Sequence, residues 1–463
     1  MKIKFSEKSK KKNIVLSKEK ESFCFLLADG GKSLKIGLGD YKDLNRRKLV
    51  ITSRQIVSLA KTNKIKKLSL EFSDFLIPNL KMKGSEIAGV MATNFLMANF
   101  EFVKYKTAPK EGWNFVEEVE ISGKISDDAK KEFLKGVIIG EETNNCRSLA
   151  NTPGGEMTPK MLAGAAKRAG RYSGIKVKVF DEKAMAKLKM NAILGVGKGS
   201  VEKPKFIVME YSKGPKKEKP VVLIGKGVTF DTGGLNIKTD DYQKDMHMDM
   251  SGAASVISAV TLAARLKIKK NIVGLIPSAE NMPSGSSYRQ GDLIKSMSGK
   301  TIEVSDTDAE GRIILADALT YAQKYNPKLV VDVATLTGAA EVALGQRASA
   351  ILTKDEKLEK LFRELGEESG DYVWPLPLWD EYEDDIKGTF GDWANTGKTR
   401  YGGAITGAIF LYQFVPSINS GQAKVPWVHM DIAPRMISID GEYLAKGAAG
   451  APVRLLVKLL EKF

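Results

Sequence analysis

The chain has 463 residues, of which 43% are apolar and 28% charged, so it is long enough for two or three domains with buried cores. This composition excludes a disordered, collagen-like or disulfide-stabilised protein. Only two histidines and two cysteines are present, which excludes a four-cysteine or three-histidine zinc site within one chain. An enzyme of this composition must use carboxylates and lysines.

The net charge of +16 is concentrated near the N-terminus, where residues 1–110 carry 24 Lys and Arg against 10 Asp and Glu. A nucleic-acid partner is one interpretation. We favour a lysine-rich solvated surface, because no recognition-helix or aromatic-interleaved motif accompanies the charge. The chain has no signal peptide and no apolar stretch of about 20 residues, which predicts a cytoplasmic protein that does not enter a membrane.

Short apolar runs alternate with helix-like stretches in residues 1–126, which predicts a small N-terminal α/β domain. Apolar residues then recur at three and four spacing through residues 127–150. This periodicity predicts a long helix that, with the following NTPGG turn, forms a linking segment over residues 127–157. In the next helix, Thr158 is the expected N-cap, Pro159 the first residue and Gly174 the stop signal.

Residues 158–463 alternate near-continuous apolar strands with helical or glycine-rich segments. This alternation predicts a larger C-terminal α/β domain with a central mixed sheet covered on both faces and a site at the strand ends. The expected strands are KVKVF, KFIVMEY, PVVLIG, NIVGLIP, TIEV and KLVVDVAT.

A glycine-rich loop follows the PVVLIG strand and carries Lys226, Asp231 and Lys238. It lacks the spacing of a phosphate-binding Walker loop, and a glycine-rich turn with surface charges is the alternative interpretation. Asp249 stands at the start of an alanine-rich helix, where an acidic residue is more often a cap than a ligand.

Asp308, Glu310 and Arg312 follow the TIEV strand at a spacing of two, so an extended backbone would project them to one side. Neighbouring carboxylates repel each other unless a divalent cation lies between them, although a cap with a salt bridge is the alternative. Together with Asp231 and Asp249, these carboxylates suffice for two divalent ions, and Lys226 could add a neutral amine. Paired metals suit water activation and polarisation of an amide carbonyl.

With these residues in place, the sequence resembles the leucyl aminopeptidase family of dinuclear cytosol aminopeptidases. The resemblance covers residues 145–455 and is weak over the first 125, where the family has a variable, macro-like domain. It rests on the segments IGKGVTFDTGGLNIK, DMHMDMSGAA, AENMPSGSSYRQGD, DTDAEGRIILADAL, DVATLTGA, PLPLWDEY and WVHMDIAP.

The resemblance implies a metal-dependent exopeptidase that releases single N-terminal residues, leucine-like ones preferred, from peptides. Asp231 and Glu310 would bridge two metals, Lys226 and Asp249 would complete the tighter site, and Asp308 the more exchangeable one. The ions expected are Mn2+ or Zn2+, with Mg2+ or Co2+ as alternatives.

The resemblance also implies that Lys238 polarises the scissile carbonyl and that Arg312 holds a bicarbonate, the general base toward a metal-bridging water. The positions expected to contact the substrate are Met246, Thr335, Leu336 and Gly338. The family further implies a homohexamer active in peptide turnover.

Two positions depart from the usual family motif: Asp306 replaces an asparagine and Ser251 a glycine. The added carboxylate of Asp306 could tighten metal binding or change the preferred side chain. The alternatives to a peptidase are a DNA-binding role of the basic N-terminal domain, together with catalysis or instead of it, and a non-catalytic scaffold. The intact ligand set argues against the scaffold.

Overall fold

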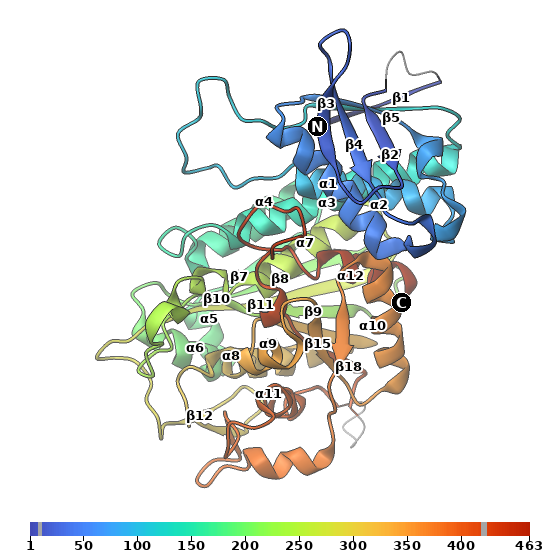
Figure 1. Cartoon of the computed structure of the whole chain (residues 1–463). Coiled ribbons are helices and arrows are strands. Elements are labelled where there is room, and N and C mark those ends of the chain that lie inside the picture. Colours follow the sequence, from blue (N-terminus) through green and yellow to red (C-terminus); the bar gives the residue numbers. More distant parts are fainter. Residues whose placement is uncertain (8–11, 418–423) are drawn as a thin grey trace. The chain divides into compact units, whose positions relative to one another are not determined.

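The computed structural model describes residues 1–7, 12–417 and 424–463, apart from the side chain of residue 240 (Figure 1). The chain forms two compact units. Unit 1 comprises Met1–Asn144 and Ser438–Gly447, and unit 2 comprises Asn145–Ile437 and Ala448–Phe463. The boundary falls within the long helix α3 (Asp127–Ala150). The functional domain limits suggested by the sequence, at residues 126 and 158, therefore stay a prediction.

Unit 1 contains two three-stranded sheets, with strand orders β1-β6-β5 and β2-β4-β3. The first sheet is parallel. Asn13, which directly precedes β2 of the second sheet, links the two sheets because its side chain forms hydrogen bonds with the backbone of Lys67 and Ser69 on β5. Helices α1 and α2 pack together beside buried strand residues. The elements are β1 (Lys2–Ser6), β2 (Ile14–Ser17), β3 (Phe23–Leu26), β4 (Lys32–Gly37), α1 (Arg46–Thr62), β5 (Lys67–Glu71), α2 (Gly84–Ala98) and β6 (Glu118–Ser122).

Unit 2 is built on a nine-stranded mixed sheet in which β16-β15-β18-β14-β9-β11-β8-β7 are neighbours in that order and β10 also pairs with β11. The central strands β9, β11, β14 and β18 are parallel, and β9, β14 and β18 are buried along their whole length. Their carboxyl ends therefore meet at one edge of the sheet. The strands are β7 (Lys176–Phe180), β8 (Lys205–Ser212), β9 (Val221–Gly225), β10 (Gly227–Asp231), β11 (Asn271–Asn281), β14 (Leu329–Ala334), β15 (Ser349–Leu352), β16 (Val373–Pro375) and β18 (Trp427–Asp431).

Helices cover both faces of this sheet: α4, α7 and α12 lie on one face and α6, α8 and α11 on the other (Figure 1). The α7 helix is alanine-rich and packs directly against the central strands. The helices are α4 (Pro159–Ser173), α5 (Glu182–Lys187), α6 (Asn191–Val196), α7 (Ser251–Arg265), α8 (Glu310–Ala322), α9 (Gly338–Leu344), α10 (Glu356–Ser369), α11 (Gly403–Tyr412) and α12 (Val453–Lys462).

The α/β class and the central mixed sheet are confirmed, as are several local predictions. Helix α3 occupies residues 127–150, and α4 begins after an N-cap at Thr158, has Pro159 in its first turn and ends at Gly174 with φ of 67°. The TIEV segment is the exception. It forms β13 (Thr301–Glu303) in a separate small sheet, where it pairs antiparallel with the preceding strand β12 (Leu293–Lys295) and parallel with the distant β17 (Trp393–Ala394). Among the described helices, none is long and apolar enough to cross a membrane.

Asp317 joins three segments of unit 2 from within α8. Its buried carboxylate accepts hydrogen bonds from the backbone N–H groups of Ala192 and Ile193 at the start of α6, at 2.9 and 3.1 Å, and of Met297 at 2.8 Å. Burial raises the pKa of Asp317 to about 7, although the three donors oppose this shift. The carboxylate thus supplies the acceptors that these buried N–H groups need.

We predict that Asp317→Ala lowers the free energy of unfolding by about 3 kcal/mol, because three buried N–H groups lose their acceptor. The matched control is Asp355→Ala, which removes the half-buried N-cap of α10. It should cost only about 1 kcal/mol. Urea denaturation followed by circular dichroism measures both values. Equal losses would show that the bonds to Asp317 contribute no more than an ordinary cap.

Candidate metal centre

A cavity of about 870 Å³ opens at the carboxyl edge of the central sheet in unit 2. It gathers the segments that follow β9, β10 and β14 with those that precede α7 and α8. Its lining residues are Lys226, Asp231, Leu235, Asn236, Ile237, Lys238, Thr239, Tyr242, Met246, Asp249, Asp306, Asp308, Thr335, Leu336, Thr337, Gly338, Glu341, Ala433 and Met436.

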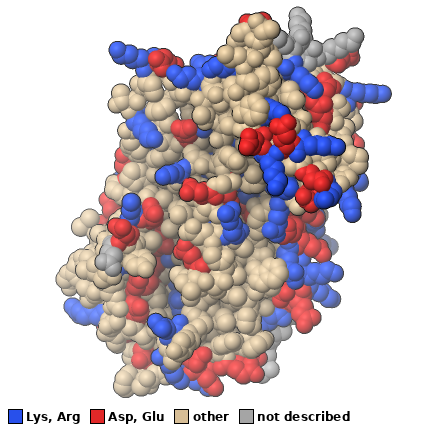
Figure 2. Space-filling model, in the orientation of Figure 1, with Lys and Arg blue, Asp and Glu red and all other residues tan. Residues whose placement is uncertain are grey.

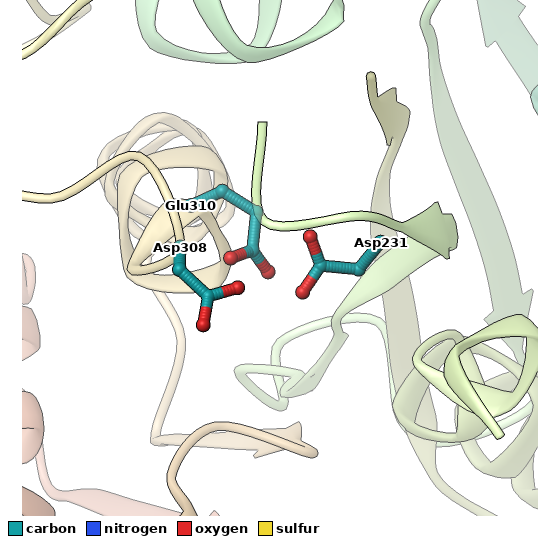
Figure 3. Close-up of side chains that lie close together, drawn as sticks. All are labelled: Asp231, Asp308 and Glu310. Atoms are coloured by element: carbon teal, nitrogen blue, oxygen red, sulfur yellow. The ribbon is translucent and has the colours of Figure 1, made fainter. Parts of the chain in front are cut away.

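Three carboxylates converge beside this cavity, as Figure 3 shows. Asp231 ends β10, Asp308 lies just before α8, and Glu310 is the first residue of α8. One oxygen from each lies within 4.8 Å of the other two. The sequence predicted that these carboxylates group together, but the expected extended backbone at residues 308–312 is wrong. Glu310 and Arg312 lie on helix α8, so their spacing of two does not project them to the same side of a strand.

Lys226 and Asp249 form the deeper side of the site. Lys226 Nζ lies 2.9 Å from Asp249 Oδ1 and 2.8 Å from Glu310 Oε1, and it donates to the carbonyl of Thr335 at 2.8 Å. A Cβ at position 311 would lie 2.7 Å from this amine, so the glycine there gives Lys226 access to the carboxylates. Asp249 is 4% exposed and also accepts a hydrogen bond from Thr335 Oγ1 at 2.6 Å.

Lys238 lies on the opposite side, at the end of the loop that follows β10. Its Nζ is 3.0 Å from Asp231 Oδ2 and also pairs with Asp308 Oδ1. The loop is fixed because Lys238 N donates to Thr232 O at 2.9 Å and Asn236 N donates to Thr307 Oγ1 at 2.8 Å. The two lysines therefore stand on either side of the carboxylates.

The site is electrostatically costly because negative groups crowd together away from water. Burial, with the charges of Asp231 and Glu310, raises the pKa of Asp308 to about 7, and burial also raises the pKa of Asp249 and Glu310. Burial opposes the charged form of both lysines, but the neighbouring carboxylates outweigh it and raise their pKa. Such a group is stabilised by added positive charge.

The residues fit divalent cations. Asp249 Oδ2 is buried and has no hydrogen-bond partner among the described residues, which leaves an oxygen ligand available. The donor set of carboxylate oxygens and one amine suits Mn2+, Mg2+ or Zn2+. Lys226 must release a proton before its nitrogen can serve as a ligand.

The structure also locates the other predicted site residues. Those expected to contact substrate all line the cavity: Met246, Thr335, Leu336 and Gly338. Arg312 is absent from the lining. It is 6% exposed and no described residue accepts a hydrogen bond from it, while its charge interacts with Glu310, Asp431 and Asp306.

Sequence reasoning missed Asp431, which ends β18 opposite Ala334 of β14. Its carboxylate accepts hydrogen bonds from Leu336 N at 3.1 Å and Thr337 Oγ1 at 2.6 Å, and so holds the loop that borders the cavity. The WVHMDIAP segment was a usable signal, since it reads as a buried strand ending in an acidic residue. Asn395 was missed as well, and only tertiary structure shows its role in holding residues 305–309.

Comparisons with known proteins show the family of the chain. The profile of the cytosol aminopeptidase family, catalytic domain, matches residues 144–457. A probable cytosol aminopeptidase of Azoarcus sp. (strain BH72) is 46% identical over 73% of this chain and 66% of its own length, so the matched part spans just under two thirds of that relative. A second one, from Chlorobaculum parvum, is 41% identical over 94% of this chain and 88% of its own.

A solved structure shares the fold of the chain. The bottromycin maturation enzyme BotP in complex with Mn superposes with a TM-score of 0.85 and 30% identity, over 95% of this chain and 93% of that one. The chain therefore belongs to the cytosol aminopeptidase family of metal-dependent aminopeptidases, as its motifs predicted.

Proposed function

We propose that this protein releases single N-terminal residues, leucine-like ones preferred, from peptides by two-metal chemistry. The observation that carries the proposal is the convergence of four carboxylates and two lysines on one cavity wide enough for a peptide end. The similar structure of BotP was solved in complex with Mn, which supports a divalent metal as the cofactor.

In this proposal Asp231 and Glu310 would be shared by two divalent ions. Lys226 and Asp249 would complete the tighter site, and Asp308 would complete the exchangeable one. Mn2+ or Zn2+ is expected, with Mg2+ or Co2+ as alternatives. When bound, such ions lower the pKa of water, polarise a carbonyl and hold the free α-amine of a substrate.

Lys238 then acts on the scissile carbonyl. The carboxylates around it keep its ammonium protonated, and its position at the cavity wall lets it donate a hydrogen bond to the carbonyl oxygen. This donation stabilises the negative charge that develops on that oxygen during attack by water.

Arg312 is proposed to hold bicarbonate. A buried guanidinium that donates to no described residue has free donors for a planar anion. A Cβ at Gly407 would lie 3.3 Å from an Arg312 terminal nitrogen, so glycine at this position leaves room beside the guanidinium. Bicarbonate held here would supply the general base.

In this proposal Met246, Thr335 and Gly338 border the pocket for the first side chain, together with Ala433 and Met436, which line the same cavity. These small and apolar groups support a leucine-like preference. The N–H of Leu336 already donates a hydrogen bond to Asp431, so the backbone carbonyl of Leu336 is the group that remains to bind a peptide.

A cytoplasmic location, a homohexamer and a role in peptide turnover are further parts of the proposal, and they rest on the resemblance. DNA binding by unit 1 stays a separate hypothesis. Acidic residues pair with several of its lysines, as in Lys4–Glu118 and Lys61–Glu101, and Figure 2 shows both signs of charge intermixed on the visible face. No described feature favours a nucleic-acid partner.

We predict that chelator-treated protein cleaves leucine p-nitroanilide only after Mn2+ or Zn2+ is added. Lys238→Ala should lower kcat by about 100-fold or more while still binding metal, because it removes one donor to the developing oxyanion. Lys244→Ala, which changes an exposed lysine near the same loop, is the control and should remain active. Full activity of Lys238→Ala would contradict this role.

We predict that Asp308→Ala reduces the metal content from two ions to one per chain, because Asp308 serves only the exchangeable site. Calorimetric titration with Mn2+, checked by elemental analysis after dialysis, measures the stoichiometry. Asp241→Ala removes an exposed acid from the neighbouring segment and should keep both ions. If Asp308→Ala still bound two ions per chain, Asp308 would not be a metal ligand.

We predict that bicarbonate accelerates the metal-loaded enzyme at least about tenfold over carbonate-free buffer, since a positioned general base contributes at least this much. Arg312→Ala should lose the acceleration without losing metal. Initial rates at rising bicarbonate and constant pH and ionic strength test both statements. If bicarbonate accelerated Arg312→Ala as much as the natural enzyme, Arg312 would not be the residue that holds the general base.

A further inference from the structure

Asp306 lines the cavity but belongs to no part of the proposed metal site. The buried Asn395 fixes its backbone: Asn395 Oδ1 accepts from Asp306 N at 3.2 Å, and Asn395 Nδ2 donates to Asp306 O at 2.6 Å. These two hydrogen bonds fix the backbone of Asp306, and therefore the point from which its side chain projects.

One oxygen of the Asp306 carboxylate is engaged and the other is free. Oδ1 accepts a hydrogen bond from Asp308 N at 2.8 Å, which an asparagine could equally accept. Among the described residues, none donates to Oδ2. The departure from the usual asparagine thus adds a negative charge to the cavity wall without changing the loop.

In the described part of the chain, no cation forms an ion pair with Asp306, although the charge of the buried Arg312 interacts with it. Among the described residues that line the cavity, the cations are Lys226 and Lys238, and both are paired with the carboxylates of the metal centre. Glu341 adds a second acid, but one of its oxygens is occupied by Gln346 Nε2 at 2.7 Å. The free oxygen of Asp306 is therefore available to pair directly with a positive group of a substrate.

Asp306 lies on the side of the cavity toward which the second residue of a bound peptide would extend. Thr335, beside the first side chain, contacts Asp249 and Lys226 on the deeper side of the site. Asp306 lies next to Thr307, which contacts the Asn236 loop on the Lys238 side. A peptide whose scissile carbonyl meets Lys238 would extend its second residue toward this side.

The wall on that side suits a long cationic side chain. Leu235 and Ile237 line the cavity and are 44% and 53% exposed. The methylene groups of a lysine or arginine can pack on such apolar groups while the charged head reaches a carboxylate.

We propose that Asp306 makes this enzyme prefer peptides whose second residue is lysine or arginine. The inference rests on the proposed aminopeptidase function and deepens it, because it names the class of peptide on which the site acts.

The test uses the metal-loaded enzyme and two amidated dipeptides, Leu-Lys amide and Leu-norleucine amide, which share a side-chain stem and differ in its charge. The amides remove a C-terminal carboxylate that Asp306 would repel. We expect kcat/KM to favour Leu-Lys amide at least about threefold at low ionic strength, and the ratio to fall as salt screens the charges. In Asp306→Asn, which keeps the acceptor for Asp308 N, the ratio should drop to about one.

Glu341→Gln is the matched control, since it removes the other acid of the lining, and its ratio should equal that of the natural enzyme. Equal rates on both amides by the natural enzyme, or a ratio that survives Asp306→Asn, would overturn the inference. So would an equal loss on both amides that excess Mn2+ restores, because Asp306 would then act on the metal. Cleavage of neither amide with metal bound would instead reject the aminopeptidase function itself.

Discussion

The crowding of four carboxylates in a buried corner of unit 2 is the constraint on which the rest of the structure depends. Asp231, Asp249 and Glu310 are each less than 5% exposed, so water cannot offset their repulsion. Lys226 and Lys238 supply the compensating charge from either side of the group. Removing one partner from such a buried network leaves an uncompensated charge, which is strongly destabilising. Divalent cations provide the same compensation with more charge, so the stability of this corner and its capacity for metal have one cause.

Sheet topology brings these groups together from distant parts of the chain. Strands β9, β14 and β18 are parallel neighbours, so Lys226, Thr335 and Asp431 at their carboxyl ends meet at one edge although they are separated by up to about 200 positions in sequence. The carboxylates reach the same edge from the end of β10 and from the starts of α7 and α8. Close packing completes the arrangement. A Cβ at Gly252 would lie 2.1 Å from the carbonyl of Val333, so only glycine lets the start of α7 come this close to β14. Asp249, just before α7, is placed beside Lys226 by that approach.

The parts of the fold that the sequence predicts well are those determined by near neighbours. The limits of α3 and the cap, proline and glycine of α4 depend on local signals and were correct. The pairing of β13 with β17, and the roles of Asp431 and Asn395, depend on partners about 90 residues away, which periodicity does not identify. The carboxylate group was found through motif spacing, yet the supposed extended backbone at 308–312 is the start of a helix. Residue types indicate the chemistry of a site more readily than its local geometry.

The metal centre and the substrate pocket share one connecting loop. Thr335 bonds Asp249 and Lys226 through its hydroxyl and carbonyl, and the next two residues are held by Asp431. The loop that borders the first side-chain pocket is thus fixed at one end by proposed metal ligands and at the other by the sheet. A change in the ligand geometry can therefore reach the proposed pocket through Thr335, and also through Met246, whose carbonyl accepts a hydrogen bond from Asp249 N at 3.3 Å. The histidines take no part in this arrangement, since His429 pairs with Asp332 inside the sheet, at 2.5 Å, and His247 does not line the cavity. Acids and lysines line the metal side of the cavity, and the carboxylate of Asp306 adds a charge beside them while its Oδ1 accepts the same Asp308 N–H that an asparagine could accept, so this departure changes the charge of the wall and not the loop.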